Sequence, residues 1–258
     1  MKTNNIHKID SRKLSILVSP YGLSFMIKKS NEESKFFEYI FDKTNPFQLE
    51  EELKKIIIER PVLKHRFEEV NVIHHNLLNT LVPSELFDNE NVENYLKYNI
   101  TLLENDKASF DQLDELYIYN VYLPFANINN VFLNHNKFIN YFHSSTVFID
   151  KIIQERKRHQ VLKLYDVYLN VYAKDFQLLI FKNEDILFYN SFEYETTDDF
   201  LYFFFFALES LNISNEDIQY HISGIDNHFK ILNDLKDFVA DWHIIKAKNE
   251  SKINNFIL

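Results

Sequence analysis

Four histidines are the residues whose type and spacing come nearest to a metal site. His74 and His75 are adjacent, and adjacent residues on a strand point to opposite faces, so their imidazoles cannot easily share one metal. His221 and His243 lie in two segments that we expect to form neighbouring strands, but the sequence offers no third ligand beside them. No HExxH spacing occurs either. We therefore interpret all four as structural histidines, with His74 and His75 in a turn or at the surface.

A cluster of carboxylates, Glu193, Glu195, Asp198 and Asp199, is a second group that could bind a cation. The same residues lie where a helix is predicted to begin, and acidic side chains there stabilise the positive end of the helix dipole. Thr196 and Asp199 have the spacing of a capping box, in which each side chain bonds the backbone N–H of the other residue. We therefore favour the helix-start interpretation over a cation site.

Two further groups could support catalysis or anion binding. Ser19 could act as a nucleophile with His135, His143 or His159, but the sequence lacks the G-x-S-x-G turn that exposes such a serine. The basic run at residues 156–158 could bind phosphate or RNA. A short basic run that ends a helix is more often a solvated terminus, because it complements the helix dipole. We therefore favour structural interpretations for both groups.

Residues 203–206 are four consecutive phenylalanines. On a helix they cover nearly all sides, which predicts a helix packed between a sheet and a neighbouring element. The alternative hypothesis is a hydrophobic surface that binds a partner.

The composition of the chain excludes several kinds of site. The absence of cysteine excludes disulfides, thiolate zinc sites and thiol catalysis. Gly22 and Gly224 are the only glycines, and two glycines cannot build a P-loop or a dinucleotide fingerprint, which use glycine for positive φ and close backbone approach. The formal net charge of −10 argues against nucleic acid and anionic membranes, since both attract positive charge.

The sequence also lacks the signals of membrane insertion and secretion. The longest apolar stretch, residues 200–208, is about half of the roughly 18 residues needed to span a bilayer. The start of the chain has no apolar segment of the kind found in a secretory signal. We therefore expect a soluble, cytoplasmic protein.

The elements that must position these residues form a weak internal repeat. Two stretches, residues 13–41 and 161–192, each read as strand, turn, strand, turn, strand. Each is followed by a helix with its own start signal: Asn45 and Pro46 in the first copy, Thr196 in the second. The doubled unit predicts two similar α/β domains facing a cleft, residues 12–160 and residues 161–258, with extra material at residues 61–110 in the first.

The remaining segments give weaker signals. We expect strands at residues 113–123, 139–142, 218–223 and 241–245, and helices at residues 127–138 and 227–238. Residues 144–146 have the side chains of a helix cap. The C-terminal residues read as a polar tail.

Residues 14–27 and 168–224 give the chain a resemblance to the actin-like ATPase superfamily, which is built from two ribonuclease-H-like domains. More narrowly, the chain is similar to an uncharacterised protein family common in the Bacteroidetes, and it resembles the type IV pilus component PilM more distantly. The resemblance implies an α/β fold with a mixed sheet and flanking helices in each domain. In active members of the superfamily, the first hairpin of each meander holds an Asp and several glycines that bind phosphate and magnesium. A pair of glycines that binds adenosine follows a later strand.

This sequence departs from that pattern at each hairpin. Residues 18–23 contain Gly22 but no Asp, and Asn170 stands where the second Asp would be, with no glycine in residues 169–176. Gly224 remains from the adenosine-binding pair. Without the carboxylate, magnesium loses its anchor, and the fold is expected without efficient ATP hydrolysis. A ribonuclease-H-type nuclease is also not supported, because two-metal cleavage needs a carboxylate on the first strand and residues 14–18 have none.

The leading hypothesis for function is therefore a non-catalytic scaffold or interaction protein with an unidentified protein partner and no cofactor. The alternative is a nucleotide-binding protein, a weak ATPase with ATP and Mg in the cleft between the domains, near Ser19, Gly22, Lys174 and Gly224. A third class, a nucleic-acid partner bound through residues 156–158, is disfavoured by the charge of the chain.

Overall fold

The structure is a computed structural model. It describes residues 10–29, 32–42, 44–98, 100–103, 106–134, 136, 138–158, 163–224, 229–239, 242–245, 251, 253, 254, 257 and 258. The chain divides into two compact units, Met1–His75 with Phe125–Phe142 and Leu258, and Asn76–Pro124 with His143–Ile257. The predicted domain boundary, between residues 160 and 161, lies outside the described residues.

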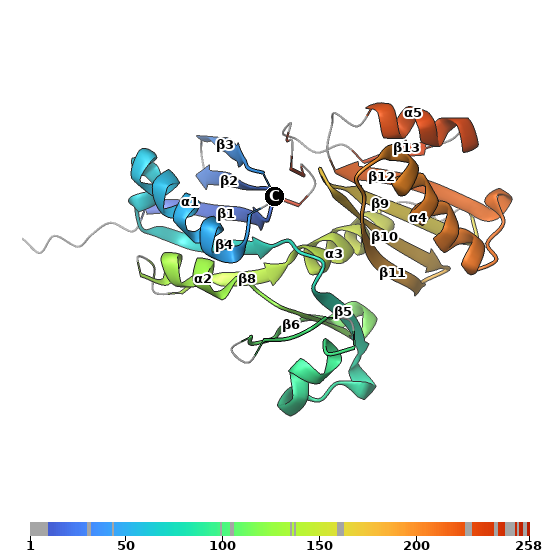
Figure 1. Cartoon of the computed structure of the whole chain (residues 1–258), viewed down its shortest axis with the longest axis horizontal. Coiled ribbons are helices and arrows are strands. Elements are labelled where there is room, and N and C mark those ends of the chain that lie inside the picture. Colours follow the sequence, from blue (N-terminus) through green and yellow to red (C-terminus); the bar gives the residue numbers. More distant parts are fainter. Residues whose placement is uncertain are drawn as a thin grey trace, which may run out of the picture. The chain divides into compact units, whose positions relative to one another are not determined.

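The first unit is built on a five-stranded mixed sheet in the order β3-β2-β1-β4-β8 (Figure 1). Its strands are β1 Asp10–Ser19, β2 Gly22–Lys29, β3 Glu32–Ile40, β4 Phe67–His74 and β8 Asn140–His143. The first three strands pair antiparallel in sequence order, and β4 returns parallel to β1. The predicted meander at residues 13–41 is therefore confirmed.

Helix α1, Pro46–Glu59, packs on this sheet with its N-terminus fixed by Asn45. The Asn45 Oδ1 accepts hydrogen bonds from the backbone N–H groups of Phe47 and Gln48, both at 3.0 Å. The Gln48 Oε1 in turn accepts from the Asn45 N–H at 3.1 Å, which completes a capping box. Helix α2, Ala126–Leu133, contributes to the same core, and it is shorter than the helix predicted at residues 127–138.

The second unit contains a sheet of the same order, β11-β10-β9-β12-β13, and a smaller sheet, β5-β7-β6. The strands of the larger sheet are β9 Tyr165–Val171, β10 Asp175–Lys182, β11 Asp185–Glu193, β12 Ile218–Gly224 and β13 Trp242–Ile244. Those of the smaller sheet are β5 Asn79–Pro83, β6 Ser109–Leu113 and β7 Ile118–Tyr122. Strands β9, β10 and β11 pair antiparallel, and β12 pairs parallel with β9. The second predicted meander is therefore confirmed, with residues 161 and 162 outside the described part.

Alternation along β9 gives the larger sheet two different faces. Val167, Leu169 and Val171 belong to the core formed with helices α4, Thr197–Ser210, and α5, Phe229–Phe238. Asp166 and Asn170 lie on the opposite face and are buried. Helix α3, Ser144–Arg156, reaches this face through hydrogen bonds to Asp166 and Gln177. The second face of the sheet is therefore buried and carries polar side chains among apolar ones such as Leu179 and Phe181.

Helix α4 begins as predicted. The Thr196 Oγ1 accepts from the Asp199 N–H at 3.1 Å, and the Asp199 Oδ2 accepts from the Thr196 N–H at 2.9 Å. Of the four phenylalanines, Phe204 is fully buried in the core and Phe206 is 54% exposed. Phe203 and Phe205 are partly buried, and the centre of the Phe205 ring lies 5.0 Å from that of Phe238 on α5. The helix is therefore packed between the sheet and a neighbouring element, as predicted, although its outer face is open to solvent.

The segment predicted as one strand at residues 113–123 is interrupted. Strands β6 and β7 pair antiparallel there, and Asp114–Leu116 with Tyr117 forms the turn between them. Tyr117 has a φ of 54°, a conformation that glycine usually adopts, so the turn has no sequence signal. The other 3₁₀ turns are Pro61–Lys64, Ser84–Leu86, Asn89–Tyr95 and Asn215–Asp217. None of the described helices is long and apolar enough to cross a bilayer.

Candidate functional site

The β1–β2 hairpin of the first unit holds the two candidate residues Ser19 and Gly22. The Ser19 hydroxyl is buried, donates to the Gly22 carbonyl at 3.1 Å and accepts from the Tyr21 N–H at 3.2 Å. The Pro20 carbonyl accepts from both the N–H and the hydroxyl of Thr44, at 2.9 and 3.0 Å. The polar groups of this turn are therefore satisfied within the first unit.

Asn170 lies near the end of β9, in the first hairpin of the second unit, and its side chain is fully buried. Its Oδ1 accepts from the Asn254 Nδ2 at 2.7 Å and from the Ser223 Oγ at 3.2 Å. Its Nδ2 donates to the Gln177 Oε1 at 2.9 Å and, at a longer 3.4 Å, to the Tyr172 hydroxyl. An amide side chain offers two donors and two acceptor sites, and the protein supplies partners for both ends of Asn170, with the Ser223 hydroxyl shared with the Leu169 carbonyl.

Gln177 extends this network to the first turn of α3. Its Nε2 donates to the Ser144 and Ser145 hydroxyl oxygens at 3.2 and 3.1 Å. The N-cap of α3 is His143, whose Nδ1 accepts from the Ser145 N–H at 3.2 Å. The prediction that residues 144–146 form the cap is therefore wrong, because these residues already lie within the helix and are buried.

A buried carboxylate, Asp111 on β6, adjoins the start of α3. Its Oδ2 accepts from the Thr146 hydroxyl at 2.6 Å and from the His143 N–H at 2.8 Å, and its Oδ1 accepts from the Tyr122 hydroxyl at 3.1 Å. Burial raises the pKa of Asp111 to about 6, although these three hydrogen bonds oppose the shift. The arrangement holds β6, β7 and α3 together within the second unit.

The C-terminal residues enter this polar site, contrary to the prediction of a polar tail. Ser251, Ile253, Asn254 and Ile257 are all buried. Asn254 Nδ2 donates to the Asn170 Oδ1 and also to the Val171 carbonyl, the latter at 3.2 Å. No local sequence signal predicts this contact, since Asn254 and Asn170 are 84 residues apart.

The other two candidate residues have different surroundings. Lys174 is exposed in the β9–β10 turn, where its carbonyl accepts from the Tyr194 N–H at 3.0 Å. Gly224 has a φ of 117°, and a Cβ there would lie 2.1 Å from the Val171 carbonyl oxygen on the adjacent strand. The close approach of β9 and β12 therefore requires glycine at this position, whether or not a ligand binds.

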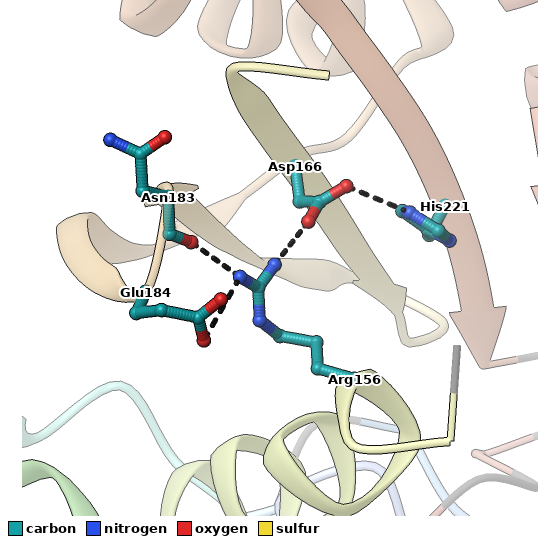
Figure 2. A network of polar contacts seen from close by, with 5 residues as sticks. All are labelled: Arg156, Asp166, Asn183, Glu184 and His221. Carbon is teal, nitrogen blue, oxygen red and sulfur yellow. Dashed lines mark hydrogen bonds and ion pairs between the residues drawn. The ribbon is translucent and has the colours of Figure 1, made fainter. Parts of the chain in front are cut away.

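The interpretation of the basic run as a solvated terminus is wrong for Arg156, since its side chain is only 6% exposed. Figure 2 shows its polar contacts with Asp166, Asn183 and Glu184. It donates to the Asp166 carboxylate and to the Asn183 carbonyl, and its Cζ lies 4.2 Å from the centre of the Phe181 ring. The second Asp166 oxygen accepts from His221 at 3.4 Å. Arg156 therefore fixes the end of α3 to β9, while Arg158 in the same run remains exposed.

The histidines have structural surroundings, but the first pair is not at the surface. His74 is fully buried, accepts from the Phe125 N–H at 3.3 Å and donates from Nε2 to the Asn129 Oδ1 at 3.0 Å. Burial lowers the pKa of His74 to about 4. His75 is also buried. The predicted turn or surface location is wrong, because β4 continues as an inner strand up to His74.

The second pair, His221 and His243, lies on neighbouring strands in register, as predicted. The His221 ring stacks on Tyr168 with ring centres 4.2 Å apart. Within the described ranges, no three carboxylate or imidazole groups are placed to hold a metal ion. His135 and His159, the other candidate partners of Ser19, lie outside the described residues.

Comparisons with known proteins identify the fold. A family model described as "Protein of unknown function (DUF3822)" matches residues 1–241. The chain is similar to a crystal structure from Bacteroides thetaiotaomicron VPI-5482, a protein with an actin-like ATPase fold and unknown function. The identity is 23%, the coverage 95% of this chain and 94% of that chain, and the TM-score 0.80. No curated protein matches the sequence.

A second similar structure is the PilM–PilN type IV pilus biogenesis complex, with 11% identity, 92% of this chain and 88% of that chain covered, and a TM-score of 0.53. These likenesses confirm the predicted actin-like ATPase fold, a mixed α/β architecture with two mixed sheets and flanking helices. They also confirm the predicted resemblance to an uncharacterised Bacteroides-type protein and, more distantly, to PilM.

Proposed function

The chain belongs to the family described as "Protein of unknown function (DUF3822)", and we propose that it is a non-catalytic interaction protein built on an actin-like fold. The proposal concerns each unit by itself. In each, the hairpin that would bind phosphate and magnesium in an active relative instead has its polar groups satisfied by the protein.

The observation that supports this proposal most directly is that the buried side chain of Asn170 is hydrogen-bonded within the protein. Magnesium is held in proteins through carboxylates and water, and an amide offers no negative charge in place of the carboxylate. The Asn170 Oδ1 already accepts from Asn254, and it shares the Ser223 hydroxyl proton with the Leu169 carbonyl. A magnesium ion would have to displace these donors from a fully buried oxygen and gain no charge neutralisation in return.

The first hairpin supports the same conclusion. Phosphate loops present free backbone N–H groups to the ligand, whereas the Tyr21 N–H donates to the Ser19 hydroxyl. In the second unit, the packing of β12 against β9 already accounts for Gly224. The remaining glycine pattern of the superfamily is therefore explained by the fold alone.

A protein partner is the functional class that remains for such a fold. The pilus structure contains PilM, a protein of similar fold, in a complex with PilN. By analogy, we infer a protein partner for this chain. Affinity purification from the native cell, followed by direct titration of the purified candidate partner, would identify it.

A thermal-shift assay of the full chain with Mg-ATP, Mg-ADP and Mg-GTP tests the absence of a nucleotide site. At a ligand concentration of 100 times Kd, binding stabilises the folded protein by about 2.7 kcal/mol. For a chain of this length that corresponds to a rise in Tm of about 5–11 °C. We expect a rise of less than about 1 °C for each nucleotide at about 1 mM.

The rival hypothesis, a nucleotide site using Ser19, Gly22, Lys174 and Gly224, predicts a rise of several degrees instead. Gly224 is unsuitable for the control, because any side chain there would clash with β9. Lys174→Ala is the better variant, since Lys174 is exposed in a turn. Stabilisation by ATP that this variant reduces would refute the non-catalytic proposal.

A further inference from the structure

The described C-terminal residues Ser251, Ile253, Asn254 and Ile257 lie against other parts of the second unit in the manner of a peptide ligand. The described residues of this segment are in neither helix nor strand, yet four of them are buried. The segment makes its own local turn: the Ser251 Oγ accepts from the N–H groups of Ile253 and Asn254 at 3.1 and 3.2 Å. The Asn254 Oδ1 then accepts from the Ile257 N–H at 3.1 Å.

The side-chain carbonyl oxygen of Asn254 accepts within the segment, so the Nδ2 group of the same side chain faces β9. That group donates to the Asn170 Oδ1 at 2.7 Å and to the Val171 carbonyl at 3.2 Å. The Lys151 Nζ on α3 donates to the Ile257 carbonyl at 3.1 Å at the other end of the segment. These contacts join the segment to β9 and α3, two elements far from it in sequence.

We infer that the end of β9 forms a peptide-binding site, occupied here by the chain's own residues 251–257. Its ligand class is a short peptide that presents an asparagine side chain from a tight turn, with isoleucines on both sides. The inference deepens the proposed interaction function and rests on it, because the site occupies the hairpin at which an active relative would hold magnesium. A partner peptide of the same chemistry would compete with residues 251–257.

The site binds an amide side chain because it offers two acceptor oxygens. Two acceptor oxygens, one from Asn170 and one from Val171, converge on the Asn254 Nδ2. An aspartate would place a carboxylate oxygen against both acceptors, and a side chain without donors would remove one hydrogen bond from each of them. Sites built to hydrogen-bond a polar group reject analogues that lack it.

The test uses the full chain with a site-specific protease sequence inserted directly before Ser251. The chain contains no cysteine, so one cysteine appended through a short linker after Leu258 accepts a single fluorophore. After cleavage, fluorescence anisotropy on dilution gives the Kd of the released octapeptide. Size-exclusion chromatography and circular dichroism check that the body of the protein stays folded.

We expect the wild-type octapeptide to remain bound after cleavage, with a Kd at least about tenfold lower than that of the Asn254→Ala or Asn254→Asp peptide. Asn170→Ala should weaken binding of the wild-type octapeptide by a similar factor. Asn190→Ala, at an exposed asparagine on β11, is the matched control and should leave the Kd unchanged. An octapeptide that leaves a folded body at once, or binds equally well with and without Asn254, overturns the inference.

If cleavage or Asn170→Ala unfolds the body, amide hydrogen exchange on the uncut chain decides. Asn254→Asp keeps the acceptor oxygen for the Ile257 N–H but loses the donor to β9, and it should speed exchange at Ile257 by about tenfold or more relative to Asn190→Ala. Equal exchange in the two variants overturns the inference. The outcome is separate from that of the nucleotide assay: nucleotide binding refutes the non-catalytic proposal, whereas loss of the octapeptide refutes only this site.

Discussion

Replacing Asn170 with aspartate would restore the carboxylate that the superfamily pattern places at this hairpin, and it tests whether the position is a magnesium site or a closed network. Asn170 is fully buried, and its Nδ2 donates to the Gln177 Oε1 at 2.9 Å. In the Asn170→Asp variant an acceptor oxygen would face that acceptor. Asn254 and Ser223 would still donate to the other oxygen.

The magnitude follows from the burial of the new carboxyl group. Full burial raises the pKa of a carboxyl group by about 3–5 units, and each unit corresponds to about 1.36 kcal/mol. Because the donors from Asn254 and Ser223 remain, we take the lower limit, a loss of about 4 kcal/mol in the free energy of unfolding at pH 8. A pKa raised in the folded state means that the loss is absent near pH 4, grows as pH rises, and is complete above the folded-state pKa.

Urea denaturation of the wild-type and Asn170→Asp proteins at pH 8 and at pH 5 measures this difference. The control is Asn190→Asp on the exposed part of β11, which should change the free energy of unfolding by less than about 0.5 kcal/mol at either pH. An Asn170→Asp protein within about 1 kcal/mol of wild type at pH 8 would refute the closed-network reasoning. Stabilisation of that variant by Mg-ATP, absent in wild type, would show that only the carboxylate is missing.

Three further predictions concern the fold around the site. Arg156→Met should lower the free energy of unfolding by about 3–5 kcal/mol because it removes the guanidinium partner of the buried Asp166 carboxylate, and adding Asp166→Leu should recover much of that loss in the same urea assay. His74, with its pKa lowered to about 4 from 6.5, should destabilise the protein by about 3 kcal/mol as pH falls from 7 to 4, since the unfolded state binds the proton first; a His74→Gln variant should lack this part of the pH dependence. Gly224→Ala should lower the free energy of unfolding by about 2–6 kcal/mol, through positive φ and a clash with the Val171 carbonyl, and a stable variant would show that β12 and β9 approach less closely.

The parts of the fold that local chemistry determines could be predicted from the sequence. Asn45 and Thr196 start helices because their side chains bond the next turn's N–H groups. The alternating apolar residues of β1 and β9 predicted both meanders. The departure from the superfamily pattern at Asn170 could also be predicted, since this prediction depends only on the type of residue near the end of the strand.

What could not be predicted depends on contacts between distant parts of the chain. Arg156 looks like a solvated helix end until Asp166 and Phe181 are placed beside it. His74 and His75 are polar by type, and only the position of β4 inside its sheet shows that they are buried. Asn254 lies in a polar sequence with no periodicity, so its burial against Asn170 has no local signal.

We propose that this actin-like fold does not bind a nucleoside triphosphate. Equilibrium dialysis of the full chain against labelled ATP with magnesium tests this proposal. We expect equal ATP concentrations on both sides of the membrane at chain concentrations up to about 100 μM, which corresponds to a binding free energy weaker than about −5.5 kcal/mol. A Kd below that concentration, abolished by removing magnesium, would contradict it.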